Sequence, residues 1–162
     1  MGPTQVTIWL AMALWCLAMI WPRGSSRVAR VLSSLGFVAY AAHIFSAYAG
    51  HYAWSHRIAW EETARDTRET VGIDSGIGLI VNFAFLLVLA TDLDFQWWSG
   101  RRRGAPWIDG MILFLILNGA VVFGEGAVRI YGVILLLVTI IGLLARFLRA
   151  RGNSAGSSSP LP

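Results

Sequence analysis

Five apolar blocks, each close to the length of a membrane span, follow one another along this chain of 162 residues. A helix needs about 20 mostly apolar residues to cross the hydrocarbon core of a bilayer. The chain is 56% hydrophobic and 14% charged, whereas soluble domains are about half apolar and about a quarter charged. These features exclude a water-soluble globule and a disordered chain. They predict an all-α integral membrane protein, a bundle of transmembrane helices.

The apolar blocks predict one transmembrane domain over residues 1–149. Its spans are expected at about residues 6–21, 31–53, 76–91, 108–123 and 130–148. Two of these blocks, the first and the fourth, are short, so four spans are the alternative to five. The residues that follow, 150–162, are rich in Gly, Ser and Pro and predict a disordered cytoplasmic tail.

The arginines predict an orientation, because cytoplasmic loops of membrane proteins are enriched in basic residues. Basic residues follow the first, third and fifth blocks: Arg23, Arg27, Arg30, Arg101, Arg102, Arg103, Arg146, Arg149 and Arg151. With five spans, these clusters place the N-terminus outside and the C-terminus in the cytoplasm. The net charge of +4 therefore reflects topology and contact with anionic headgroups of the bilayer. No pattern typical of nucleic-acid binding is present.

The long polar segment between the second and third blocks predicts a helix over residues 54–71. Oppositely charged pairs four residues apart, Glu61 with Arg65 and Arg65 with Glu69, favour helix there. Gly72 is a suitable stop. We expect this helix to continue the second span beyond the outer face and to carry a net negative charge.

All three histidines lie on or just beyond the second span, at His43, His51 and His56. His43 and His51 share a stripe with small residues, which predicts that this face points into the bundle. One interpretation is structural packing through hydrogen bonds. Another is a haem or transition-metal site, with Glu61 and Glu62 as further ligands. No other span carries a histidine, so a haem held by two histidines would require a homodimer or a partner subunit.

Other polar residues lie at membrane depth, where ionisable groups are costly and often functional. His43 is expected near the midplane of the membrane, and Asn82, Asn118 and Glu125 in the outer half of the bundle. Together they suggest a third interpretation, a path for protons or small solutes. At the inner interface, Asp92 and Asp94 are expected to pair with arginines. The expected partners are Arg101, Arg102 and Arg103.

Several short motifs occur in a characteristic order from the end of the second block onward. They are His51-Tyr52-x-Trp54-Ser55-His56, Gly72 with Gly76-x-Gly78, Asn82-x-x-Phe85, Asp92, Trp97-Trp98 and the run Asn118 to Gly126. This order, over about half of the chain, resembles small bacterial polytopic membrane proteins to which no activity is assigned. The resemblance implies a bacterial inner membrane and nothing about chemistry.

Sequence signatures of enzymes are mostly absent. The chain has no G-x-S-x-G, H-E-x-x-H or P-loop motif. Cys16 would lie in hydrocarbon without a base, so we expect it to be a buried apolar residue. The sequence therefore favours a non-enzymatic accessory, assembly or structural subunit of the inner membrane. The polar helix would contact a membrane-protein partner or a second copy.

Overall fold

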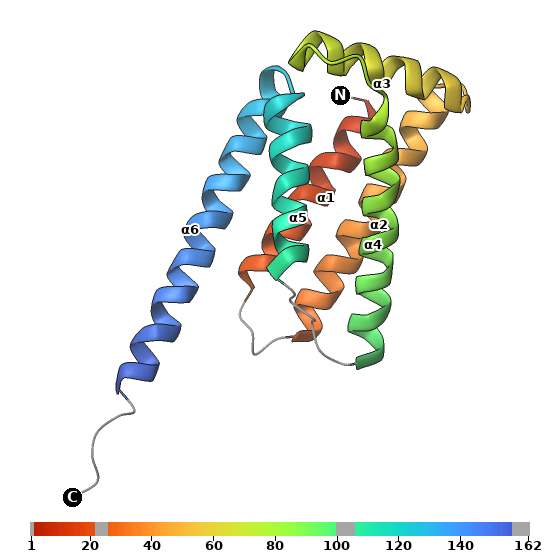
Figure 1. The fold of residues 1–162 in the computed structure, drawn as a ribbon. Coiled ribbons are helices and arrows are strands. Elements are labelled where there is room, and N and C mark those ends of the chain that lie inside the picture. Colours follow the sequence, from red (N-terminus) through yellow and green to blue (C-terminus); the bar gives the residue numbers. More distant parts are fainter. Residues whose placement is uncertain (1, 22–25, 100–105, 157–162) are drawn as a thin grey trace, which may run out of the picture.

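The computed structural model describes residues 2–21, 26–99 and 106–156, and within these ranges the chain is helical without strands. The elements are α1 (Pro3–Ile20), α2 (Ser26–Gly50), α3 (His56–Val71), α4 (Ile77–Ser99), α5 (Pro106–Ile116), the π-helix η1 (Leu117–Val122) and α6 (Gly126–Gly156) (Figure 1). Four of them, α1, α2, α4 and α6, are long and apolar enough to cross a membrane. The apolar stretch Pro106–Val122 is shorter. The predicted helical bundle is confirmed, and its fifth span stays a prediction.

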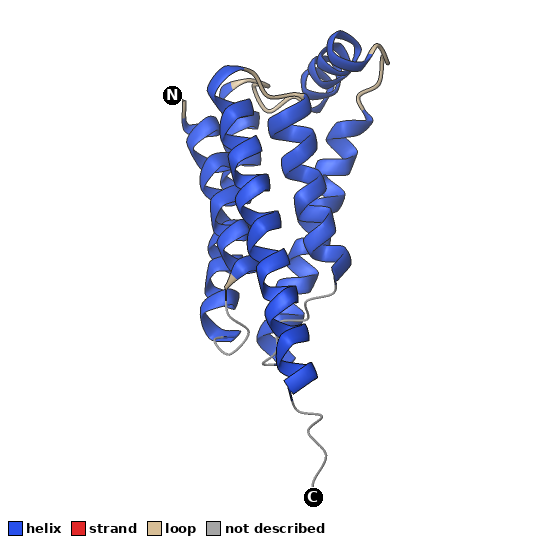
Figure 2. Ribbon diagram, turned by 90° about the vertical axis from the view of Figure 1, so that its left-hand side faces the viewer, coloured by secondary structure: helices blue, strands red, loops and turns tan. Residues whose placement is uncertain are grey.

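Helices α1, α2, α4 and α5, the last continued by η1, run side by side (Figures 1 and 2). Helix α6 packs against α1 and η1 and slants away from the other helices towards its C-terminal end. Helix α3 lies across one end of this bundle, which we call the α3 end. The chain begins near the α3 end, and α6 finishes at the opposite end. The arginines at the start of α2 and in the last turns of α6 therefore share the end remote from α3. Arg23 and the cluster 101–103 lie outside the described residues.

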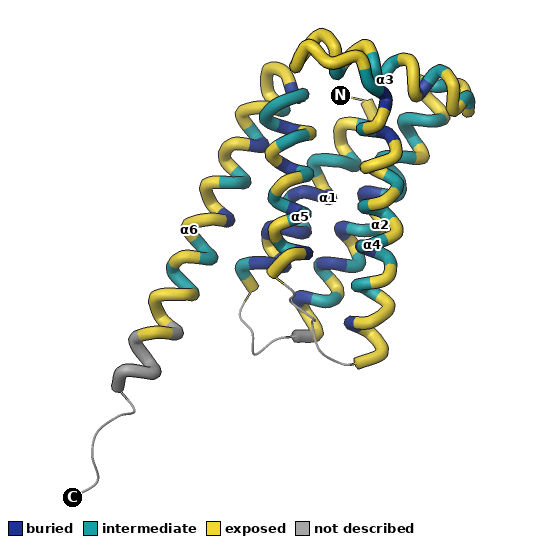
Figure 3. Tube along the Cα trace, in the orientation of Figure 1, coloured by how far each residue is buried: buried dark blue, intermediate teal, exposed yellow. Residues whose placement is uncertain are grey.

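Helix α1 forms the centre of the core (Figure 3). Its buried face includes Met12, Trp15 and Cys16, which confirms the expectation for the cysteine. The indole of Trp15 lies over Gly36 of α2, where a Cβ atom would come within 2.6 Å of the ring. Glycine at this position lets the backbone of α2 approach the large aromatic side chain.

Contacts with α1 and η1 hold α6 in place. The hydroxyl of Tyr131 donates a hydrogen bond of 2.8 Å to the carbonyl oxygen of Trp9, and the two rings stack at 4.9 Å. Near the other end, Arg146 donates to the carbonyl oxygen of Met19. Much of the remaining α6 surface is exposed and apolar (Figure 3).

The end of α6 corrects the prediction of a disordered tail from residue 150. The helix continues to Gly156. Residues 157–162, the rest of the predicted tail, lie outside the described part of the chain.

The second span does not continue as one long helix, and that prediction is wrong. Helix α2 ends at Gly50. Ala53 and Trp54 then adopt left-handed backbone angles, with φ of 47° and 60°. The Oγ of Ser55 accepts a hydrogen bond of 3.3 Å from the backbone N–H of Ile58 and so caps the separate helix α3. The chain turns at this corner instead of projecting outward.

Helix α3 is fixed to the start of α4. Ala59 is fully buried on its inner side. The ring of Trp60 covers Gly76 so closely that a Cβ atom there would overlap it. At its end Gly72 adopts φ of 79°, and its N–H bonds the carbonyl oxygen of Arg68, which confirms the predicted stop. The helix is therefore held through Ala59 and Trp60 in its first half and is capped at both ends.

Candidate functional site

A cavity of about 180 Å³ lies inside the bundle in the half nearer α3. Its walls come from α1, α2, α4, α5, η1 and α6, and most of the lining residues are apolar. Three polar side chains line it: Tyr40 and His43 from α2, and Asn82 from α4. The structure thus brings together two of the residues that the sequence predicted for the outer polar set, His43 and Asn82.

His43 is fixed by a contact with the first turn of α1. Its Nδ1 lies 2.9 Å from the carbonyl oxygen of Thr4. Because a carbonyl oxygen can only accept, Nδ1 carries the proton and donates. The other ring nitrogen, Nε2, is then an acceptor in the neutral imidazole. This placement confirms that His43 faces the bundle interior.

Tyr40 is a member of this site that sequence reasoning missed. Its side chain is 3% exposed, and its ring packs against Trp15 with centroids 5.4 Å apart. Its hydroxyl lies 3.4 Å and 3.5 Å from the backbone and side-chain oxygens of Asn82. These distances exceed the usual range of O–H···O hydrogen bonds. Tyr40 stands three residues before His43 and so shares its helix face, which is the signal that could have revealed it.

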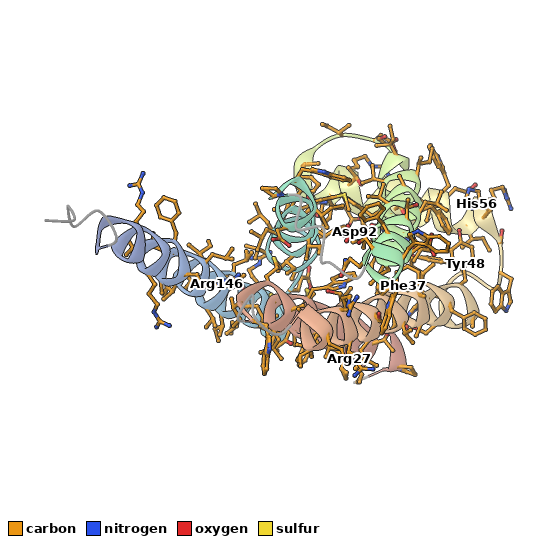
Figure 4. All side chains as sticks on the ribbon, turned by 90° about the horizontal axis from the view of Figure 1, so that it is seen from below. Arg27, Phe37, Tyr48, His56, Asp92 and Arg146 are labelled. Carbon is orange, nitrogen blue, oxygen red and sulfur yellow. The ribbon has the colours of Figure 1, made fainter. Side chains whose placement is uncertain are left out.

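The other two histidines lie outside the bundle interior. His51 and His56 are exposed at the corner between α2 and α3, so the prediction that His51 faces inward is wrong. The Nδ1 of His56 lies 2.9 Å from the hydroxyl oxygen of Tyr48, and Figure 4 shows these two side chains together. Tyr48 is the centre of an aromatic cluster that includes Tyr52 and Phe83. These two histidines help to form the corner.

The predicted metal or haem ligands do not converge. Glu61 pairs with Arg57 at 3.5 Å, and Glu62 pairs with Arg65, so both carboxylates pair within α3. Among the residues that the structure describes, no group of three or more His, Cys, Asp or Glu could hold a metal ion. At about 180 Å³ the cavity is also smaller than the roughly 300–1,000 Å³ of pockets for larger ligands. The haem or metal alternative stays a prediction without supporting geometry.

The remaining outer residues do not extend the cavity into a path. Asn118 lies in η1, where its carbonyl oxygen accepts the N–H of Phe123 at 3.0 Å. Glu125 is exposed in the turn between η1 and α6. The neighbouring Arg129 donates to the carbonyl oxygen of Gly124 at 2.9 Å. Neither Asn118 nor Glu125 lines the cavity with His43, so this geometry does not favour the proton or solute path.

A second polar cluster joins α2 to α4 at the arginine-rich end. Gln96, which is 2% exposed, donates from Nε2 to Asp92 at 2.6 Å. Arg30 donates to the backbone oxygen of Gln96 at 3.1 Å, and its guanidinium lies 5.2 Å from the ring centroid of Trp97. Asp92 points into the space between α4 and α5 in Figure 4. Asp94 is exposed.

The predicted charge pairs at this end stay a prediction. The arginines expected to pair with Asp92 and Asp94, at 101–103, lie outside the described residues. Sequence reasoning overlooked Gln96 and did not connect Arg30 with this site. The spacing of four between Asp92 and Gln96, which places both on one helix face, was the available signal.

The outward side of α3 carries six exposed charged residues, which we call the charged face. They are Arg57, Glu61, Arg65, Asp66, Arg68 and Glu69. Of the two predicted pairs, Arg65–Glu69 occurs at 4.0 Å, whereas Glu61 pairs with Arg57. Burial, together with Glu62 and Glu69, raises the pKa of Asp66 above its ordinary value, against the lowering effect of Arg65.

The described fold defines a class: an all-helical protein with four helices of membrane-spanning length. No known protein family, curated protein or solved structure matches the chain. The resemblance to small bacterial polytopic membrane proteins therefore stays a prediction.

Proposed function

We propose that the protein is a non-enzymatic polytopic subunit of the bacterial inner membrane, which supports the structure or assembly of a larger membrane complex. The charged face of α3 is the surface that contacts the partner, either another membrane protein or a second copy of this chain. One observation carries the proposal. Helix α3 lies across the end of the bundle (Figure 1), is packed against the start of α4 through Trp60, and exposes its charged side chains.

These charged side chains contribute little to the stability of the fold. The contacts that hold α3 against the rest of the protein come from its opposite side, through Ala59 and Trp60. The charged face forms ion pairs within α3 and one with the following loop, Arg68 with Asp74 at 3.1 Å. Exposed ion pairs of this kind contribute about 0–1 kcal/mol each. A charged surface that is held in place and contributes little to folding is suited to recognition.

The orientation that we propose puts α3 outside the cytoplasm. The described arginines of early α2 and late α6 share the end remote from α3, and basic residues favour the cytoplasmic side. With five crossings, the N-terminus and α3 then face the periplasm, and the C-terminus faces the cytoplasm. The partner surface is accordingly periplasmic.

Site-specific photo-crosslinking in membranes tests this proposal. A photoreactive residue replaces Asp66 on the charged face, and a matched control replaces Leu137, an exposed apolar residue of α6. We expect a discrete protein adduct at position 66, which is lost when Glu61→Lys and Glu69→Lys are added. Its mass separates a second copy from another protein. Diffuse products without a discrete protein adduct at either position would overturn the proposal.

A further inference from the structure

The cavity beside His43 combines an apolar lining with a small number of hydrogen-bonding groups. Its walls include Met12, Trp15 and Ile116, whereas Tyr40, His43 and Asn82 supply the polar atoms. This composition is typical of a binding site for a small molecule, in which apolar contacts give affinity and a few polar groups fix orientation.

The volume restricts the occupant to about one ring. An apolar protein cavity of about 150 Å³ accommodates benzene. At about 180 Å³, this cavity has room for a six-membered ring with one or two small substituents. The π-helix η1 contributes to the wall, through Gly119 and Ala120. Single π-helical turns occur frequently at functional sites.

The hydrogen-bonding groups indicate which substituent the ring should carry. Donation from Nδ1 to Thr4 leaves Nε2 of His43 as an acceptor. The hydroxyl of Tyr40 is only loosely held, at 3.4 Å and 3.5 Å from the oxygens of Asn82, and can donate to a better acceptor. A hydroxyl on the ring could donate to His43 and accept from Tyr40 at the same time.

We propose that this cavity binds a monocyclic phenol, with the ring among the apolar side chains and the phenolic hydroxyl between His43 and Tyr40. The ligand is either a free small phenol or the ring of a membrane-soluble quinol, since the two share this chemistry. Only a ring with its two hydroxyls fits this volume, so the tail of a quinol would lie outside the cavity. The inference goes beyond the proposed partner surface. The two proposals are independent of each other, because the cavity lies inside the bundle, whereas α3 lies across the end of the bundle.

Ligand binding to the full-length protein in detergent tests the inference by calorimetry. The probes are phenol and toluene, which share the ring and differ by the hydroxyl. We expect saturable binding of phenol at least about tenfold tighter than that of toluene, because only phenol satisfies the buried polar groups. Equal binding of the two probes, or no saturable binding of phenol, would overturn the inference.

Two variants connect binding to the named residues. His43→Asn keeps a donor near the Nδ1 position but lacks Nε2, so we expect phenol binding to weaken by about tenfold and toluene binding to stay unchanged. Tyr40→Phe removes the second partner and should act in the same direction. If His43→Asn unfolds, Tyr40→Phe still provides the test. Unchanged phenol affinity in a folded His43→Asn variant would overturn the inference.

A quinol with a ten-carbon tail and untailed hydroquinone distinguish the two sources. Tighter binding of the tailed quinol, lost in His43→Asn, assigns the site to a membrane quinol ring. Equal affinity of the two assigns it to a free phenol. Failure of both to compete with phenol would exclude a quinol ring and assign the site to a small free phenol.

Discussion

The imidazole Nδ1 of His43 lies 2.9 Å from the carbonyl oxygen of Thr4, which joins the second half of α2 to the first turn of α1. The same carbonyl also accepts from the hydroxyl of Thr7 at 3.1 Å. The histidine therefore has a structural partner within the chain, and its second nitrogen, Nε2, is left as an acceptor on a residue that lines the cavity. One residue contributes both to helix packing and to the chemistry of the site.

Loss of this contact should destabilise the bundle measurably. We expect His43→Leu to lower the free energy of unfolding by about 1 kcal/mol, since interhelical hydrogen bonds in membrane proteins contribute about that amount. His43→Asn, which keeps a donor near Thr4, is the matched control and should lose less. Thermal unfolding in detergent provides the comparison. Equal losses in the two variants would contradict a role for the Nδ1 hydrogen bond.

The contact between Trp15 and Gly36 makes a second prediction. A Cβ atom at position 36 would come within 2.6 Å of the indole, so Gly36→Ala should destabilise the protein by about 1–3 kcal/mol through overpacking. Gly110→Ala is the control, because a Cβ there meets nothing within 4 Å. Adding Trp15→Leu should reduce the cost of Gly36→Ala in a double-mutant cycle. Additive effects of the two changes would argue against direct packing.

The contact that holds α3 against the start of α4 can be tested at Gly76, where the ring of Trp60 covers the backbone. Gly76→Ala should displace that ring and loosen α3 while leaving α1 and α2 in place. Hydrogen exchange should then be faster in α3 alone. Gly50→Ala, where a Cβ has open space, is the control. Faster exchange throughout the bundle would contradict a local effect of the contact between Trp60 and Gly76.

The sequence predicted the helical rods well, because their apolar blocks have the length and composition of spans. It missed the break after α2 for a physical reason. Left-handed angles usually require Gly or Asn, and here Ala53 and Trp54 adopt them. The aromatic packing at this corner joins Tyr48 of α2, Tyr52 of the following loop and Phe83 of α4.

The candidate site was only partly predictable. His43 and Asn82 stood out as polar residues in apolar blocks, and their neighbourhood in the structure matches that expectation. The cavity itself depends on the distances of α4 and η1 from α1. The sequence pattern of a single helix does not determine such distances. The π-helical turn at Leu117–Val122 is likewise invisible in the apolar periodicity.

Asp66 provides a prediction of pH dependence. Its pKa is raised in the folded protein, first by burial and then by Glu62 and Glu69. The charged carboxylate is therefore unfavourable in the folded state above the raised pKa, and this cost disappears as the pH falls towards about 4. We expect Asp66→Asn to raise the thermal midpoint at pH 7 and to have no effect near pH 3.5. A lower midpoint at pH 7 would contradict the direction of the shift.

We propose that α3 and the end of α6 lie on opposite sides of a membrane. Cysteine labelling in intact cells tests it most directly, because the native Cys16 is buried and can be replaced by Ala. Asp66→Cys and Arg149→Cys then place single thiols on α3 and late α6, both at exposed positions. We predict that an impermeant maleimide labels position 66 in intact cells and position 149 only after lysis. Labelling of both positions in intact cells would contradict this orientation.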